Sequence, residues 1–116
     1  MASLIIAGSR NIEDYEVVRL AVEESGWWPQ ITEIVSGGAR GVDRLGERLA
    51  KRNNMHIRIF PADWLAYGKS AGYKRNCDMA EYADFLVAVW DGQSRGTQHM
   101  INIMKNLGKP VYIKNV

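Results

Sequence analysis

Short apolar runs alternate along this chain with longer segments in which apolar residues recur at helical spacing. Short runs of this kind are typical of strands, and the longer periodic segments are typical of helices that cover them. The pattern predicts strands at residues 3–7, 31–35, 56–60, 84–90 and 110–113. It predicts helices at residues 13–25, 42–52, 71–82 and 97–107.

The order of these segments predicts the fold class. Strands and helices alternate, which favours a parallel sheet with right-handed crossovers and helices on both faces. The run DFLVAVW at 84–90 is almost continuously apolar, as expected for a central strand that is covered on both faces. The segment that follows Pro61 is expected to be a loop. We therefore predict an α/β fold, a single Rossmann-like domain with a five-stranded, mainly parallel sheet and helices on both faces.

Composition narrows the classes of protein. With 116 residues, 47% of them hydrophobic and 24% charged, the chain is expected to be one globular domain over residues 1–116. The formal net charge of +2 is mild, whereas a dedicated nucleic-acid binder usually carries a stronger, clustered basic surface. A single cysteine excludes an internal disulfide and a cysteine-rich zinc site. Neither a metal nor a cofactor is predicted.

No targeting or membrane segment is predicted. The apolar run near the N-terminus is only four or five residues long before Gly8-Ser9-Arg10, which is too short for a signal peptide. No stretch approaches the ~20 apolar residues that cross a bilayer. We expect a cytoplasmic protein that makes no contact with a membrane.

Glycines and arginines gather in the segments that leave strand ends and enter helices. In a parallel sheet, ligands bind outside the carboxyl ends of the strands, near the point where strand order reverses. The candidate binding residues are Gly8, Ser9 and Arg10 after the first strand, Ser36, Gly37, Gly38, Arg40, Gly41 and Asp43 after the second, Lys69, Tyr73, Arg75 and Asn76 after the third, and Asp91, Gly92, Ser94, Arg95, Gly96 and Thr97 after the fourth.

Two well-known nucleotide signatures are absent. A dinucleotide fingerprint needs G-x-G-x-x-G, and the first loop offers one glycine. The tripeptide GKS at 68–70 resembles the end of a Walker motif, but Asp63 stands where that motif requires a glycine.

The stretch SGGARGVD at 36–43 suits an anion nonetheless. Its glycines expose backbone N–H groups at the start of a helix, where the helix dipole also favours negative charge. A charge-assisted hydrogen bond from Arg40 would add roughly 1.5–3 kcal/mol. Asp43 is expected to cap the helix or to accept a hydrogen bond from a ribose hydroxyl. The alternative is a glycine-rich turn in which Asp43 is a first-turn helix charge. The stretch WDGQSRGT at 90–97 repeats the arrangement, with Ser94 or Thr97 as the cap, so the pair of loops favours a ligand.

Other residues leave alternatives open. Arg75 points away from the helical stripe of Tyr73 and Cys77, so it is either a ligand contact or a solvated arginine. Trp64 and Tyr67 are expected either to stack on a base or to pack their loop onto the sheet. The segment 27–29 (WWP) lies at the opposite rim, at the core edge or at a subunit contact.

Four motifs carry a resemblance to a known family. They are GSR at 8–10, SGGARGVD at 36–43, YGKSAGYKRN at 67–76 and WDGQSRGTQHM at 90–100. In order and spacing they resemble the SLOG superfamily of Rossmann-like proteins that bind nucleotide-derived ligands. That superfamily includes the LOG phosphoribohydrolases, DprA and a small YpsA/YspA-type branch, which is the most similar. The resemblance implies one SLOG-type domain over residues 1–116 and, as in LOG proteins, a homodimer.

The resemblance to LOG enzymes also implies site residues. Those enzymes cleave nucleoside monophosphates to the base and ribose 5-phosphate. The matching positions are Arg75 at their catalytic arginine, Met79 at their methionine, Ala83-Asp84 at their Ala-Asp pair and Gly96-Thr97 at their Gly-Thr pair. Two positions depart from the LOG pattern: Asn76 replaces the lysine and Met100 replaces the glutamate. A methionine side chain cannot perform the acid–base chemistry of a glutamate.

Three functions follow as hypotheses. Binding or sensing of a nucleotide or ADP-ribose-like ligand is favoured, because Met100 cannot perform acid–base chemistry. The alternative is a nucleoside-monophosphate N-glycosidase in which Arg75 and Asp91 are catalytic, or Asp43 takes the place of Asp91. The second alternative is DprA-like binding of single-stranded DNA, which the modest net charge disfavours.

Overall fold

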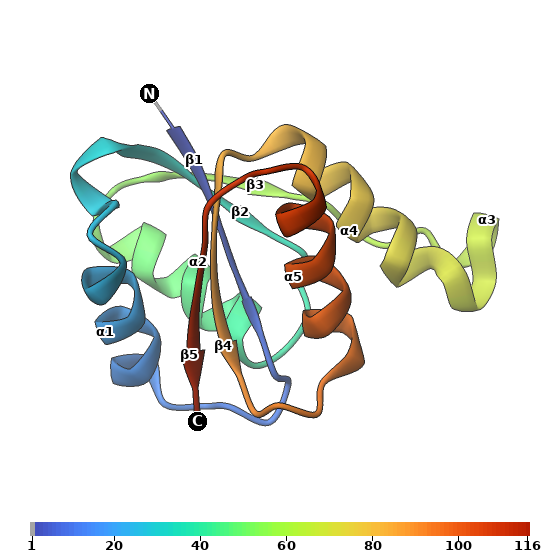
Figure 1. Cartoon of the computed structure of the whole chain (residues 1–116), viewed down its shortest axis with the longest axis horizontal. Coiled ribbons are helices and arrows are strands. Elements are labelled where there is room, and N and C mark those ends of the chain that lie inside the picture. Colours follow the sequence, from blue (N-terminus) through green and yellow to red (C-terminus); the bar gives the residue numbers. More distant parts are fainter. Residues whose placement is uncertain (1) are drawn as a thin grey trace.

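The computed structural model describes residues 2–116 as a sheet flanked by helices (Figure 1). The strands are β1 (Ala2–Gly8), β2 (Ile31–Ser36), β3 (His56–Ile59), β4 (Phe85–Trp90) and β5 (Val111–Asn115). The helices are α1 (Tyr15–Ser25), α2 (Val42–Arg52), α3 (Trp64–Tyr67), α4 (Ala71–Tyr82) and α5 (Arg95–Asn106), with 3-10 turns η1 (Trp28–Gln30) and η2 (Gly68–Ser70).

The sheet is parallel throughout, in the order β3-β2-β1-β4-β5. The chain first builds outward from β1 to β3, then crosses back to place β4 on the other side of β1. Strand order therefore reverses between β1 and β4, which is where ligands bind in folds of this kind. The α/β fold class is confirmed, and every strand pair is parallel.

Helices cover both faces of the sheet, as expected. In Figure 1, α1 and α2 lie on one face and α4 and α5 on the other. One core cluster packs α1 and α2 against Leu4 and Ile6 of β1. The second packs α4 and α5 against Ile5 and Ala7 of the same strand. Because alternate residues of β1 face opposite ways, its continuously apolar sequence serves both clusters.

Local capping residues explain the helix ends. The Asp14 side chain accepts a hydrogen bond from the N–H of Glu16 and caps α1, while Gly26 (φ 77°) ends that helix in the left-handed conformation. The side chain of Ser94 accepts from the N–H of Thr97, so Ser94 is the cap and α5 begins at Arg95. The predicted start at Thr97 was therefore two residues late.

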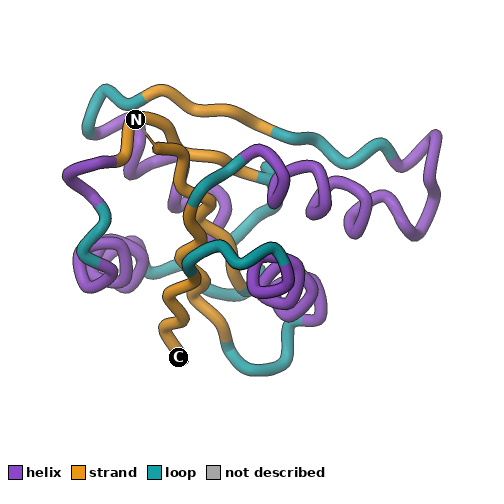
Figure 2. The backbone as a smooth tube through the Cα atoms, turned by 45° about the horizontal axis from the view of Figure 1, so that its top comes forward, coloured by secondary structure: helices purple, strands orange, loops and turns teal. Residues whose placement is uncertain are grey.

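The segment after Pro61 was predicted to be a loop, but it contains short helices. It contains α3, which begins because Asp63 Oδ1 accepts a hydrogen bond from the N–H of Ala66. The turn η2 follows and joins α3 to α4. This extension projects from the body of the molecule in both Figure 1 and Figure 2.

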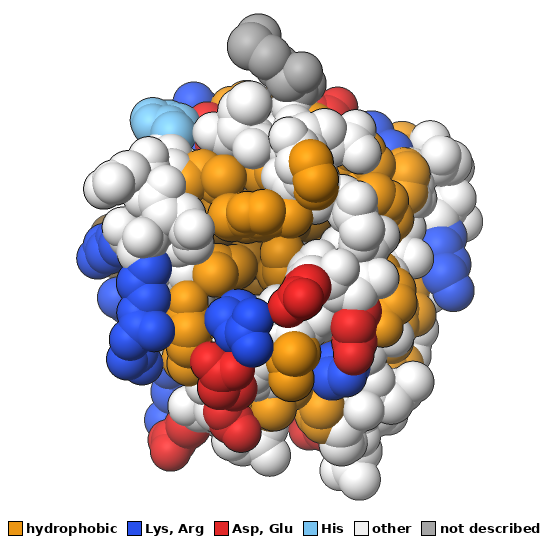
Figure 3. Space-filling view, turned by 90° about the vertical axis from the view of Figure 1, so that its left-hand side faces the viewer, with side chains coloured by type: hydrophobic (Ala, Val, Ile, Leu, Met, Phe, Trp, Pro, Cys, Tyr) orange, Lys and Arg blue, Asp and Glu red, His pale blue; other side chains and the backbone are white. Residues whose placement is uncertain are grey.

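The Trp27-Trp28-Pro29 segment directly precedes β2, so it lies at the end of the sheet opposite to the glycine-rich loops that follow the strands. The Trp27 ring packs on Phe85 at the edge of the core, with ring centroids 4.8 Å apart. Trp28 and Pro29 line an apolar hollow of about 510 Å³ beside α1 and α2. Figure 3 shows apolar side chains gathered in the middle of this side of the molecule. Over residues 2–116 no helix has the length and apolar character needed to cross a membrane.

Candidate functional site

A cleft lies at the carboxyl ends of the strands, beside the point where strand order reverses. It consists of three adjoining cavities, and Arg10 and Arg75 line all three. We call them the outer chamber (about 620 Å³), the inner chamber (about 70 Å³) and the side chamber (about 210 Å³). Loops after β1, β2, β3 and β4 contribute to their walls, as the sequence predicted.

The backbone at the end of β1 and in the loops after β1 and β2 approaches other backbone so closely that glycine is required at two positions. A Cβ on Gly8 would stand 2.0 Å from the carbonyl oxygen of Val89. Gly41 has a φ of 82°, and a Cβ there would stand 2.6 Å from backbone atoms of Arg10. Part of the glycine content at this rim therefore serves contact between loops rather than contact with a ligand.

Ser9 ties these loops together. It is buried, its N–H donates to the carbonyl oxygen of Val89 (3.1 Å), and its hydroxyl accepts from the N–H of Asp91 (3.1 Å). Its carbonyl oxygen accepts from the N–H of Val42 (3.4 Å) at the start of α2. Ser9 thus positions the loops after β1, β2 and β4 relative to one another.

Arg75 reaches from α4 across the carboxyl end of β2. Its Nη1 donates to the carbonyl oxygens of Gly37 (2.5 Å) and Phe60 (3.4 Å), and its Nε donates to Asn76 Oδ1 (3.2 Å). A Cβ on Gly37 would stand 2.6 Å from Nη1, so that glycine gives the guanidinium its place. Arg75 is therefore half-buried and fixed in the cleft; it is not a solvated helix arginine.

Asp43 is a buried carboxyl group in the inner chamber, and it is not the cap of α2, whose first position follows Gly41. It is 8% exposed, and its Oδ2 accepts from the N–H of Ala39 at 3.2 Å. Burial raises the pKa of Asp43 to about 6, against the opposing effects of the Ala39 N–H and of Arg75. Such a group changes protonation near neutral pH, which suits proton transfer.

Glu47 is a second buried carboxylate that the sequence analysis missed. It is 7% exposed, lines the outer chamber, and its Oε2 accepts from the Ser36 hydroxyl at 2.7 Å. Ser36 thereby supports the β2–α2 loop from within, and its hydroxyl also accepts from the N–H of Gly38 (3.0 Å). The signal in the sequence was the i, i+4 spacing of Asp43 and Glu47, which puts both side chains on one face of α2. Gly46 lies on α2 between them and lets the helix approach Ile6 of β1 closely.

The start of α5 forms part of the wall of the inner chamber, which Asp43 also lines. Ser94, Gly96 and Thr97 line it, together with Asn76, whose side-chain N–H donates to the carbonyl oxygen of Gly96 (3.2 Å). The first N–H groups of a helix have no acceptor within the helix, and together with the dipole they favour an anion.

Asp91 serves its own loop instead. Its Oδ1 accepts from the N–H groups of Gln93 (2.8 Å) and Ser94 (2.9 Å), and these hydrogen bonds lower the pKa of Asp91. Asp91 does not line the three cavities, and neither do the exposed residues Gly92 and Arg95. Lys69 and Tyr73 line the side chamber.

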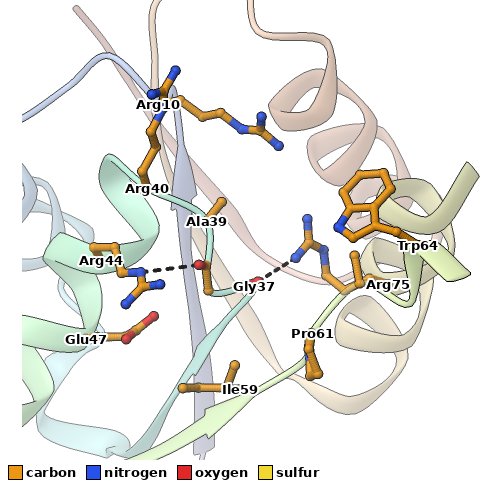
Figure 4. A pocket seen from close by; sticks show the side chains of 12 residues that line it. Arg10, Gly37, Ala39, Arg40, Arg44, Glu47, Ile59, Pro61, Trp64 and Arg75 are labelled. Atoms are coloured by element: carbon orange, nitrogen blue, oxygen red, sulfur yellow. Dashed lines mark hydrogen bonds between the residues drawn. The ribbon is translucent and has the colours of Figure 1, made fainter. Parts of the chain in front are cut away.

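The outer chamber combines positive charge with apolar surface. Figure 4 shows Arg10, Arg40 and Arg44 on one side and Arg75 and Trp64 on the other. Ile59 and Pro61, which the sequence analysis did not select, also line it. The chamber therefore offers cationic groups for an anion and an exposed aromatic ring.

Comparisons with known proteins give two findings. The model of the YspA, cpYpsA-related SLOG family matches residues 3–67, which run from β1 through α3. The Gene 61 protein of Mycobacterium phage D29 is 35% identical over 118 residues, covering 96% of this chain and 94% of that protein. No solved structure matches the chain significantly. The family match spans the motifs after β1 and β2 whose loops build one side of the cleft, and the chain belongs to the YspA, cpYpsA-related SLOG family.

Proposed function

We propose that this protein binds a phosphorylated, nucleotide-derived ligand in the cleft. The observation that carries the proposal is the convergence of Arg10 and Arg75 with the first turn of α5 at the reversal of strand order. Membership of the SLOG family agrees with a nucleotide-related ligand.

The inner chamber is the natural place for the phosphate. Arg10 is exposed to the chamber, Arg75 is held beside it, and the start of α5 offers backbone N–H donors. A charge-assisted hydrogen bond contributes about 1.5–3 kcal/mol, so several of them approach the ~8 kcal/mol of micromolar binding. Gly8, Gly37 and Gly96 also line the inner chamber, where the absence of a side chain leaves their backbone accessible.

Isothermal titration with AMP, ADP-ribose and NAD tests the proposal. We expect binding in the micromolar range for at least one of them, with the nucleotide recovered intact. Arg10→Ala should weaken it by about tenfold or more, as expected for one charge-assisted contact. Arg95→Ala is the matched control, because Arg95 is exposed and does not line the cleft. No binding of any of the three nucleotides at millimolar concentration would exclude the proposal.

A short single-stranded oligonucleotide belongs in the same titration. Binding of DNA that falls steeply with salt, without binding of the nucleotides, would assign the cleft to the DprA-like function instead.

One observation favours a second function, N-glycosidic hydrolysis of a nucleoside monophosphate. Asp43 is buried beside Arg75 in the inner chamber and has a pKa of about 6. In such hydrolysis water adds to C1′, the bond from C1′ to the base nitrogen breaks, and the base leaves with a proton. We assign the carboxylate role to Asp43 rather than Asp91, whose Oδ1 accepts two backbone hydrogen bonds.

Mass spectrometry of AMP, GMP and CMP mixtures after long incubation tests this second function. Release of free base that falls about 10²-fold in Asp43→Asn would support it, that being the usual size of an acid–base contribution. Asp91→Asn is the control and should stay within a few-fold of the unmodified chain. The opposite ranking of the two variants would return the role to Asp91, and the absence of free base would leave binding alone.

A further inference from the structure

The outer chamber has two chemically different walls. Trp64, Pro61 and Ile59 form an apolar wall, and Arg44 and Glu47 of α2 form a polar wall. Figure 4 places Trp64 and Pro61 on one side of the chamber and Arg44 and Glu47 on the other. Such a pair of walls, in a chamber that shares Arg10 and Arg75 with the proposed anion site, suits a flat ring with polar edges.

Trp64 is a large aromatic residue that does not pack into either core cluster. Its side chain belongs to α3 on the projecting extension, and the residue is 55% exposed. The ring lies near Gly72, where a Cβ would stand 3.8 Å from it and 3.9 Å from Arg75. Trp64 is thus held next to the fixed guanidinium of Arg75 while much of its surface stays open. Tyr67, the other aromatic residue of α3, does not line the chamber.

The polar wall presents an acceptor and donors side by side. One carboxylate oxygen of Glu47 accepts from Ser36, and the residue lines the chamber. Arg44 uses its Nε on the carbonyl oxygen of Gly38 (3.2 Å), so its terminal N–H groups are not needed for that bond. An acceptor beside donors complements the edge of a base that carries an amino group next to a ring acceptor or carbonyl.

We propose that the outer chamber is a nucleobase subsite. Trp64, Pro61 and Ile59 hold the flat face of the base, and Glu47 and Arg44 contact its amino-bearing edge. The subsite rests on the proposed function, because the phosphate of the same ligand occupies the inner chamber. It narrows the ligand to purine or pyrimidine nucleotides that carry an amino group on the base.

Titration of the full chain with AMP and ribose 5-phosphate separates the subsite from the phosphate site. Base–aromatic stacking makes AMP bind about tenfold or more tightly than ribose 5-phosphate. Trp64→Ala should remove that preference and leave the affinity for ribose 5-phosphate unchanged. Trp64→Phe should keep most of the preference. Leu65→Ala is the matched control, since Leu65 is fully exposed on the same helix and outside the chamber.

The outcomes distinguish the two proposals. Equal affinity of the unmodified chain for AMP and ribose 5-phosphate, or equal loss of both in Trp64→Ala, overturns the subsite while phosphate binding stands. Failure of both probes to bind overturns the proposed function together with the subsite.

A second titration tests the polar wall. AMP should bind the unmodified chain about tenfold more tightly than purine riboside 5′-monophosphate, which keeps the ring acceptor but lacks the amino group. Glu47→Gln keeps an acceptor for Ser36 and presents N–H groups to the chamber, so it should reverse or abolish this preference. The affinity for ribose 5-phosphate should stay the same. Binding of purine riboside 5′-monophosphate as tight as that of AMP would overturn the assignment of the base edge.

Discussion

At the scale of single residues, the cleft shows how neighbours change ordinary side chains. Arg75 donates to backbone carbonyl oxygens of the loop after β2 and of the segment after β3, which fixes a normally mobile side chain. Asp43 faces Arg75 from α4, Arg10 from the β1–α1 loop and Glu47 on its own helix. Burial outweighs the Ala39 N–H and the two arginines, so the pKa of Asp43 lies above its ordinary value.

The first prediction concerns stability against pH. The pKa of Asp43 is about 6 in the folded protein, above the ordinary value of 3.8 for an aspartate, so the folded state binds an extra proton between these two pH values. Folding stability should therefore fall as pH rises from about 4 to about 6, by on the order of 2–3 kcal/mol from this group. Asp43→Asn should be more stable than the unmodified chain at pH 7 and match it near pH 4.

Urea unfolding of both chains at pH 4 and pH 7 measures this difference. The other carboxyl groups are the same in both chains, so the difference between them isolates Asp43. A constant difference at the two pH values would show that folding does not raise the pKa of Asp43.

The second prediction concerns backbone strain. Gly41→Ala places a Cβ 2.6 Å from backbone atoms of Arg10 and does so at a positive φ. The backbone of the loop after β1 or after β2 must then shift, which costs free energy of folding. We expect a loss of more than about 2 kcal/mol in the free energy of unfolding. Gly96→Ala is the control, because Gly96 lies in α5 with open space around its Cα, and it should be neutral or slightly stabilising. Similar losses in the two variants would remove the steric explanation.

At the scale of elements, strand ends and helix ends are held by contacts distant in sequence. Ser9, which follows β1, holds the start of α2 through its carbonyl oxygen and the turn after β4 through its hydroxyl. At the other end of the sheet, Lys109 follows α5 and its Nζ donates to the carbonyl oxygens of Ala80 (2.7 Å), Glu81 (3.0 Å) and Ala83 (2.7 Å). These last carbonyls of α4 have few helical partners, so a cation there satisfies the end of the helix.

The third prediction tests this helix end. Lys109→Met removes the charge and keeps the apolar stem, and we expect a loss of about 1–3 kcal/mol in unfolding free energy. Lys105→Met in the last turn of α5 is the matched control, because Lys105 is exposed and makes no side-chain hydrogen bond among those found over residues 2–116. Urea unfolding checks both. A loss in Lys109→Met no larger than that of the control would mean that water replaces Lys109 at no cost.

At the scale of the whole molecule, the cleft depends on strand order. Because the strands are parallel, the loops after β1, β2 and β4 lie at one rim, and the cleft lies where strand order reverses between β1 and β4. Helix α4 adds Arg75 from the opposite face. The two core clusters hold these layers on the shared strand β1. A ligand in the cleft would therefore contact both layers and stabilise the folded molecule as a unit.

The fourth prediction follows from this linkage. AMP at a hundred times its Kd should raise the free energy of unfolding by about 2.7 kcal/mol, with a matching rise in Tm. At the same AMP concentration Arg10→Ala should show a smaller rise, since its affinity is lower. Thermal unfolding with and without AMP measures both. A rise of the same size in Arg10→Ala would place the AMP outside the cleft.

The sequence by itself determined the elements and the fold class. Apolar periodicity, capping residues and helix-ending glycines act within a few residues, so strands and helices could be read to within two residues at most ends. The alternation of strands and helices then left a parallel sheet as the expected arrangement. The short helix α3 was missed, because four residues show no period and only Asp63 signals it.

Tertiary structure alone decided which residues share the cleft and in what state. Sequence spacing does not show that Arg75 contacts Gly37, which lies 38 positions away, or that Glu47 is buried next to Ser36. It left Asp43 and Asp91 equivalent, whereas burial raises the pKa of one and turn hydrogen bonds lower that of the other. Burial and long-range hydrogen bonds are properties of the assembled layers, and no local pattern specifies them.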